Sequence, residues 1–396
     1  MITDEYARTL ASVNDRIRDL KDRGFYTFEM PFTAAPGGRS EIDHREVIML
    51  TSGNYLGLAG HPEINKAVKD ALDTYGSGAC GARLNNGTTV LHLELEEKLA
   101  EWMGTEAAIT YSSGYMANLG TISALCDSDT IVITDQINHM SILDGCRLAE
   151  GAVKIFAHNS MEKLEYVLKR NADAKKKFVV VDGVYSMDGE IAPLDDIHRL
   201  TEQYGAMLMV DEAHGTGFLG DNGRGAGEHF GIIPDITMGT FSKTLGGVGG
   251  FVTASHDIVE FLRHSAHAYM FNASLPAPTV AGVLKALELM RREPWRTEKL
   301  WENTMRFRSG LIRAGFEVLG SVTPVIPILV GDDIAALRMS KELVADGLYI
   351  SGAIFPAVPK GRARFRATVT AAMTTEDVDR AVELLADAAR RHNVLA

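Results

Sequence analysis

Residues 206–243 constrain the fold of this chain most, because they place polar side chains directly after short apolar runs. One apolar run, AMLMV, ends in Asp211, and His214 follows three residues later. A second run, ITM, is followed by small and hydroxyl residues and then by Lys243. Such runs are typical of parallel strands covered on both faces, and ligands bind beyond the carboxyl ends of these strands. The stretch therefore predicts a cleft with Asp211 at its base.

Apolar runs alternate with amphipathic segments through most of the middle of the chain, and polar residues follow the runs at the same ends. This order predicts an α/β fold with a mainly parallel sheet, flanking helices and one crevice. With 396 residues the chain is long enough for one large domain and a smaller one. We expect an N-terminal arm over residues 1–48, a large cofactor-binding domain over 49–285 and a small α+β domain over 286–396.

Charge and composition argue against several classes of protein. Forty basic and fifty-two acidic side chains give a net charge of -12, which disfavours nucleic acid or an anionic membrane as a partner. No apolar run is long enough to span a bilayer and the first residues lack an apolar signal segment, so we expect a cytoplasmic protein. Cys80, Cys126 and Cys146 lack metal-binding spacing, so we expect reduced thiols and no metal site.

A lysine and an acid at strand ends are groups that pyridoxal phosphate (PLP) requires. The amine of Lys243 can form a Schiff base, and the carboxylate of Asp211 can keep a pyridine nitrogen protonated so that the ring accepts electrons. Each residue alone has a simpler explanation, since an Asp often caps a helix and a Lys after a loop is usually solvated. Together they predict a PLP site.

A phosphate cup is expected where the run AAITYS leads into a helix. Ser113, Gly114 and Tyr115 open that helix, whose unpaired N–H groups and dipole attract anions. Thr240, at the end of the ITM run, could add a hydroxyl to the same phosphate. Any strand-to-helix turn can contain Ser-Gly, so this signal counts only together with the lysine and the acid.

Other polar residues could hold the ring or the substrate. His139 follows a strand-like run and could stack on a flat ring or cap a helix, and Ser186 follows another run and could reach a phenolic oxygen. Asn54 lies between glycines and is either a turn former or a ligand. Three arginines that alternate along a C-terminal strand share a face, and one of them could clamp a carboxylate; they are Arg362, Arg364 and Arg366.

Nine stretches, spread over nearly the whole chain, resemble the α-oxoamine synthase family of fold-type I PLP-dependent enzymes. This family includes 8-amino-7-oxononanoate synthase, 2-amino-3-ketobutyrate CoA ligase, serine palmitoyltransferase and 5-aminolevulinate synthase. The stretches are NYLGLAGHP, YGSGACGARLNNGTTVLH, SSGYMAN, NHMSILDG, VYSMDGEIAPL, VDEAHGTGFLGDNGRG, GTFSKTLGG, FNASLP and VPKGRARFR.

The resemblance implies a role for each of the polar residues. Lys243 would form the Schiff base with PLP, Asp211 would pair with the pyridine nitrogen and His139 would stack on the ring. Ser186 and His214 would contact the phenolic oxygen, and the phosphate would be bound by Gly114, Tyr115 and Thr240. The substrate carboxylate would be bound by Asn54 and Arg366. Ser274 of FNASLP would reach the phosphate of a neighbouring subunit. The last contact implies a homodimer with shared active sites.

The reaction implied by the family is the decarboxylative condensation of a small α-amino acid with an acyl thioester. The chain departs from the family at Phe355, Ala357, Met373 and Ala82, and the small Ala82 implies room for alanine or serine as well as glycine. The donor could be acyl-CoA or an acyl carrier protein. The basic residues Lys175–Lys177 could meet an acidic carrier or be a solvated face.

Three alternatives remain open at this point. An aminotransferase or lyase of the same fold needs the same lysine and aspartate, although NHMSILDG and VPKGRARFR disfavour it. A non-catalytic partner subunit, as in heterodimeric relatives that lack the lysine, is opposed by Lys243. A cofactor-free binding protein would leave the polar residues at the strand ends unexplained.

Overall fold

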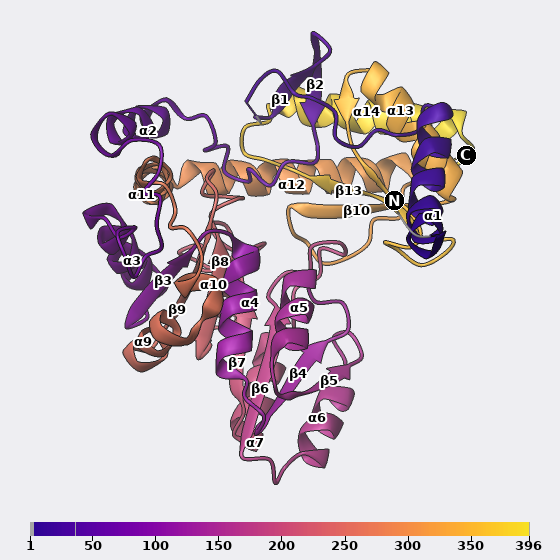
Figure 1. Ribbon diagram of the computed structural model, residues 1–396. Coiled ribbons are helices and arrows are strands. Elements are labelled where there is room, and N and C mark those ends of the chain that lie inside the picture. Colours follow the sequence, from indigo (N-terminus) through magenta and orange to yellow (C-terminus); the bar gives the residue numbers. More distant parts are fainter. Residues whose placement is uncertain (1–3, 36, 396) are drawn as a thin grey trace. The chain divides into compact units, whose positions relative to one another are not determined.

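The computed structural model describes residues 4–35 and 37–395, which fold into two compact units (Figure 1). One unit is Gly53–Leu300, and the other combines Met1–Ser52 with Trp301–Ala396. The N-terminal segment, expected as a separate arm, shares a unit with the C-terminal segment because strand β2 (Arg45–Met49) pairs with β11 (Leu348–Tyr349). The unit boundaries thus lie at 52/53 and 300/301. The assignment of domains to 1–48, 49–285 and 286–396 stays a prediction.

The larger unit is built on a seven-stranded sheet with the order β3-β9-β8-β7-β6-β4-β5. The five strands from β8 to β5 are parallel neighbours, whereas β9 pairs antiparallel with β3 and β8. The central strands are buried on both faces, which explains their continuous apolar sequences. The predicted α/β fold with a mainly parallel sheet is confirmed. The bounds are β3 Ala107–Tyr111, β4 Thr130–Asp135, β5 Ala152–Phe156, β6 Lys176–Asp182, β7 Met207–Asp211, β8 Ile236–Thr240 and β9 Gly250–Ala254.

Helices connect each of these parallel strands to the next (Figure 1). The segment from Asp257 to Arg292 is divided among three helices. The chain leaves the helical path before Pro276, which lacks an N–H donor and disfavours helical backbone in the residue before it. The helices are α2 Pro62–Tyr75, α3 Val90–Met103, α4 Gly114–Leu125, α5 Met140–Leu148, α6 Met161–Arg170, α7 Leu194–Tyr204, α8 Ala226–His229, α9 His256–Ser265, α10 His267–Met270, α11 Ala277–Arg292 and α12 Trp295–Ala314, the last of which continues into the smaller unit.

The smaller unit contains two three-stranded sheets, β1-β2-β11 and β10-β13-β12. Its closing helix, α14, begins with a capping box in which Thr374 and Asp377 bond each other's backbone N–H groups. Outside these sheets, Val318 makes an isolated bridge with Ile328. The remaining elements are α1 Asp4–Asp22, β1 Arg39–Ile42, β10 Val325–Gly331, α13 Asp333–Ala345, β12 Gly352–Ala353, β13 Ala363–Thr368 and α14 Thr375–Arg391. Over the described residues, no helix has both the length and the apolar composition needed to cross a membrane.

A buried ion network anchors the glycine-rich loop before α3. Arg83 donates to both carboxylate oxygens of Glu96, at 2.8 and 3.2 Å, and Arg263 donates to the same carboxylate at 2.8 Å. Burial would raise the pKa of Glu96, but the two guanidinium groups outweigh it and the pKa is lowered. This network ties the loop to α3 and α9.

We predict that Glu96→Gln lowers the free energy of unfolding by about 3 kcal/mol, because it leaves two buried guanidinium groups without an anion. Urea denaturation of the wild-type and variant proteins measures the difference. Glu101→Gln is the matched control, since Glu101 forms an exposed pair with Lys98 on the same helix and should change stability little. Equal effects of the two substitutions would contradict the prediction.

Candidate active site

The carboxyl ends of the parallel strands carry the residues that the sequence singled out. Asp211 ends β7, Thr240 ends β8, and His139 follows β4 directly before α5. Asp182 ends β6 and lies opposite Asp211 in the strand register. The polar residues therefore gather along one edge of the sheet, as predicted from the alternation of strands and helices.

Asp211 is held by two hydrogen bonds at the base of this edge. Its Oδ2 accepts from Nδ2 of Asn118 at 2.7 Å, and its Oδ1 accepts from the backbone N–H of Ala213 at 2.8 Å. The side chain of Asp211 is only 4% exposed. Asn118 is contributed by α4, and no local sequence signal distinguished it from other helical residues. Two donors on a buried carboxylate fix its direction, which suits pairing with a cationic ring nitrogen.

His139 is brought close to Asp211 and Lys243. Burial lowers the pKa of the imidazole, the charge of Asp211 raises it and the charge of Lys243 lowers it. The net effect is a lowered pKa. The ring caps α5, since Nδ1 lies 3.3 Å from the N–H of Ser141 and accepts from it. The backbone N–H of His139 donates to Oδ2 of Asp182 at 2.8 Å. The lowered pKa favours a neutral imidazole, and the hydrogen bond to Ser141 shows that the helix-capping explanation applies. The stacking role of His139 stays a prediction.

Lys243 is half-buried and lies against Gly53. A Cβ atom added at Gly53 would come within 3.0 Å of Cγ of Lys243, so a larger residue there would press on the lysine stem. The charge of Lys243 acts on Asp182 as well as on His139. His214, from the loop after β7, is also buried, and its Nδ1 lies 2.7 Å from the hydroxyl of Tyr55.

The residues of the expected phosphate cup lie at the start of α4 and at the end of β8, and their role in binding phosphate stays a prediction. Ser113 caps α4, because its Oγ accepts from the N–H of Met116 at 3.1 Å. A Cβ atom at Gly114 would lie 3.0 Å from Oγ1 of Thr240, so the turn and the end of β8 are in close approach and require glycine. The hydroxyl of Tyr115 instead donates to Asp144. Ser113, Gly114 and Thr240 therefore lie together, while the Tyr115 hydroxyl is engaged elsewhere.

The other predicted residues have the following places. Asn54 is buried and its Oδ1 accepts from the N–H of Ala59 at 3.1 Å, which is the turn-forming alternative. The Oγ of Ser274 is buried without a hydrogen-bond partner among the described residues, and the Ser274 N–H donates to Gly81 at 3.0 Å. Arg366 is half-buried in β13 of the smaller unit. The ligand roles of these three residues stay predictions.

Ser186 lies on a loop that is tied down by a histidine between two acids, which the sequence analysis missed. Nδ1 of His158 lies 3.0 Å from Asp135, and its Nε2 lies 2.9 Å from Glu190, on the loop that carries Ser186. Burial lowers the pKa of His158, but the two carboxylates outweigh it and the pKa is raised. Asp135 ends an apolar run just as Asp211 does, and that was the signal available in the sequence.

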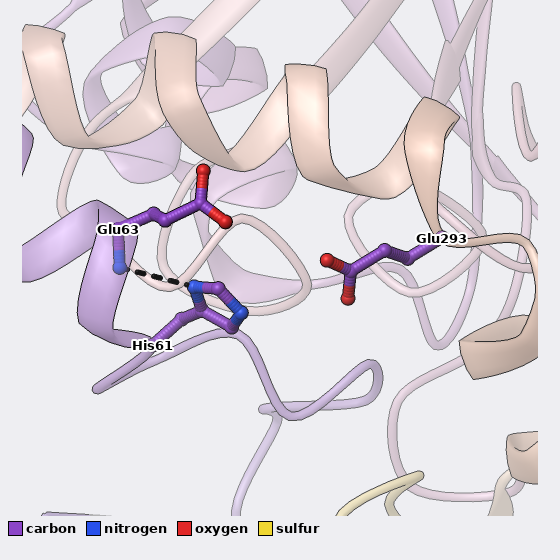
Figure 2. A group of neighbouring side chains, drawn as sticks. All are labelled: His61, Glu63 and Glu293. Atoms are coloured by element: carbon purple, nitrogen blue, oxygen red, sulfur yellow. Dashed lines mark hydrogen bonds between the residues drawn. The ribbon is translucent and has the colours of Figure 1, made fainter.

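One group of possible metal ligands lies apart from these residues. His61, Glu63 and Glu293 have ligand atoms within 4.8 Å of one another (Figure 2). However, Nδ1 of His61 accepts from the N–H of Glu63, while Arg292 donates to Glu63 and Arg296 donates to Glu293 at 2.7 Å. Because each carboxylate already has a guanidinium partner, the group is explained as an ion-pair network between α2 and the end of α11.

The assembled groups suit PLP. A buried carboxylate with fixed direction can face the pyridine nitrogen, a neutral imidazole can lie on the ring, and a lysine amine is at hand. A glycine turn at the start of α4, beside a threonine hydroxyl, provides room for a phosphate. The fold and this set of side chains define a transferase of the fold-type I class.

Comparison with known proteins agrees with this class. The aminotransferase class I and II family matches residues 45–385. The chain is 40% identical to an 8-amino-7-oxononanoate synthase of Bacillus pumilus, over 97% of this chain and 98% of that one. It is 44% identical to a 4-hydroxy-2,2'-bipyrrole-5-methanol synthase of Serratia sp., over 93% of this chain and 58% of that one.

Solved structures of serine palmitoyltransferase share the fold. The Sphingomonas wittichii enzyme superposes with a TM-score of 0.95 at 35% identity over the whole of both chains. A structure of the S. paucimobilis enzyme with a bound PLP-myriocin aldimine has a TM-score of 0.94 at 35% identity, over 98% of this chain and 99% of that one. This chain belongs to the aminotransferase class I and II family and, within it, to the α-oxoamine synthases.

We predict that His158 stabilises the fold at low pH and loses this effect as the pH rises. A raised pKa means that the folded state holds the proton more tightly, so the stabilisation is complete below the ordinary pKa near 6.5 and disappears above the raised pKa. His158→Gln should lower the free energy of unfolding by about 2 kcal/mol at low pH and by clearly less at high pH.

Urea denaturation at about pH 6 and about pH 9 checks this expectation. His264→Gln is the control, since His264 faces Glu260 on the exposed surface of α9 and its replacement should matter little at either pH. A loss of stability in His158→Gln that is independent of pH would show that the charge of His158 has no part in it.

Proposed function

We propose that this α-oxoamine synthase condenses a small α-amino acid with an acyl thioester, releasing carbon dioxide and giving an α-amino ketone. The observation that carries the proposal is the gathering of Asp211, His139 and Lys243 at the carboxyl edge of the parallel sheet. The chain is accordingly a PLP-dependent acyltransferase. Bound PLP supplies an electron sink that stabilises negative charge on the α-carbon of the amino acid.

The chain's own residues would prepare this chemistry. Asp211, held by Asn118 and the N–H of Ala213, preserves the positive charge on the ring nitrogen. His139 would lie against the ring. The amine of Lys243 would hold the cofactor and would act as the general base that takes the proton from the α-carbon. Ser186 and His214 would address the phenolic oxygen, and Ser113, Gly114, Tyr115 and Thr240 the phosphate.

Substrate recognition is proposed for Asn54 and Arg366, which would bind the amino-acid carboxylate. We propose glycine, alanine or serine as the amino substrate, because the small side chain of Ala82 would leave room for a substrate side chain larger than that of glycine. Two other departures from the family have structural explanations. Met373 is buried in the core of the smaller unit, and Phe355 is a partly exposed ring with the ammonium of Lys360 at 5.2 Å. Neither side chain by itself identifies the acyl group.

A homodimer with shared active sites is proposed from the segment around Ser274. Near it, Phe271 is 79% exposed, and the glycine-rich loop bridges to this segment through Ala82 and Ala273. A large exposed aromatic ring in this segment fits a surface that a second copy covers. The Ser274 hydroxyl would then reach the phosphate bound by the other subunit.

The choice between acyl-CoA and an acyl carrier protein is narrowed by the basic residues 175–177. Lys175 pairs with Asp129, Lys176 pairs with Asp127, and Lys177 donates to backbone carbonyls. These lysines lie at the start of β6, whereas the proposed chemistry occurs at its other end. Lys175 and Lys176 therefore belong to a solvated, ion-paired face, whereas Lys177 is buried, and acyl-CoA is the simpler donor. Reduced, unpaired cysteines support a cytoplasmic location.

We predict that Lys243→Ala abolishes the visible absorbance of the lysine-bound cofactor and lowers turnover by about 10³-fold or more, because a covalent link and a base are lost together. Absorbance spectroscopy and carbon dioxide release measure the two effects. Lys66→Ala, at an exposed lysine on α2, is the control and should behave like the wild-type protein. Unchanged turnover in Lys243→Ala would refute the mechanism.

A substrate panel separates the proposed synthase from its alternatives. Glycine, alanine and serine are each mixed with acyl-CoAs of increasing chain length, and products are identified by mass spectrometry. We expect one amino acid to give an α-amino ketone with stoichiometric carbon dioxide. Amino-group transfer to a keto acid without carbon dioxide would instead indicate an aminotransferase. A protein that stays colourless with added PLP would indicate a non-catalytic partner subunit.

A further inference from the structure

Tyr55 and His214 form a buried hydrogen-bonded pair. The proposed chemistry gives a role to His214 but none to Tyr55. The hydroxyl of Tyr55 lies 2.7 Å from Nδ1 of His214, although the residues are 159 positions apart. Tyr55 is completely buried and His214 nearly so. A short contact between two buried polar groups holds both in place, because breaking it would cost each group a hydrogen bond where water has little access.

The ring of Tyr55 is fixed by its surroundings. Its centroid lies 4.9 Å from that of Phe218, in the loop that follows His214, and 6.2 Å from the imidazole at a steep angle. The N–H of Tyr55 donates to Gly53 at 2.8 Å, and Arg296 donates to the carbonyl of Leu56 at 3.1 Å. The hydroxyl therefore has little freedom to leave the histidine.

We propose that Tyr55 is a positioning residue that sets the tautomer and direction of His214. At neutral pH a tyrosine hydroxyl keeps its proton and can donate it, and a neutral imidazole has one nitrogen that accepts. Donation from Tyr55 makes Nδ1 the acceptor and places the ring proton on Nε2. The Nε2–H is then the donor that His214 offers to the phenolic oxygen of PLP; this last step rests on the proposed function.

Gly53, Asn54 and Tyr55 follow one another in the chain, and each serves a different part of the proposed site. Gly53 leaves room for the stem of Lys243, Asn54 is the proposed substrate ligand, and Tyr55 holds His214. The segment GNYLGL, which the resemblance used only for Asn54, thus lies against both Lys243 and His214, two residues of the proposed cofactor site. Tyr55 itself acts on the proposed cofactor site only through His214.

The tautomer can be measured without PLP. In protein labelled with ¹⁵N-histidine, long-range ¹H–¹⁵N spectra distinguish the protonated ring nitrogen from the unprotonated one, and the His214 signal is assigned by its loss in His214→Gln. We expect the wild-type apoprotein to show a proton on Nε2 of His214. A proton on Nδ1 would overturn the proposal, whether or not the enzyme condenses amino acids.

Tyr55→Phe then tests the cause, since it removes the hydroxyl and keeps the ring against Phe218. We expect a mixture of His214 tautomers, about five- to tenfold weaker PLP binding, and a titration of the visible cofactor band moved to higher pH by about half a unit. The shift follows because the phenolic oxygen loses a reliable donor and binds a proton more readily. We expect kcat to fall more than KM rises.

Tyr349→Phe is the matched control, because it removes another buried tyrosine hydroxyl, which donates to Thr27 at 3.3 Å in the smaller unit. It should lower stability without changing the His214 tautomer or the cofactor titration. The same tautomer and titration in Tyr55→Phe as in the wild-type protein would refute the positioning role. If Tyr55→Phe does not fold, the wild-type tautomer still decides the proposal.

Discussion

Three buried acids within a short distance of one another are the constraint on which the larger unit depends. Asp182 and Asp211 lie opposite each other at the ends of adjacent strands, and Glu212 follows Asp211 directly. Burial raises the pKa of Asp182 well above its ordinary value, and the charge of Asp211 raises it further. Two buried carboxyl groups this close to each other disfavour a second negative charge, and burial opposes the charge on Asp182 in particular.

The third buried acid, Glu212, is held by hydrogen bonds from backbone N–H groups. Burial raises the pKa of its carboxyl to about 7, while its two oxygens accept from the N–H groups of Ala226 and Gly227, each at 2.8 Å. A Cβ atom at Gly215 or Gly225 would collide with this carboxylate, at 2.4 and 2.2 Å. The glycines of the loop are thus required by a buried acid, and the acid in turn fixes the loop that carries His214 and Phe218.

Contacts between distant parts of the sequence give the site its precision. Asn118 on α4 directs Asp211, the backbone of His139 is held by Asp182, and the loop of Ser186 is held by His158. Each of these partners comes from another βα unit of the sheet.

Much of this protein could be predicted from its sequence because the relevant signals are local. Apolar runs alternating with helices determine a parallel sheet, and a polar residue directly after such a run must lie at the carboxyl edge. Asp211, His139, Thr240 and Lys243 were found in this way. The family resemblance added their chemical roles and the reaction class.

The tertiary structure decided which partner each side chain has. Asn118, Tyr55 and His158 carry no local signal of function, since an Asn in a helix or a Tyr in a loop has many uses. In the tertiary structure the hydroxyl of Tyr115 bonds Asp144, and the segment after Asp257 forms three helices. A strand's end can be read from the order of its own residues. A hydrogen bond between residues 159 positions apart depends on how the strands are ordered in the sheet, which no local pattern specifies.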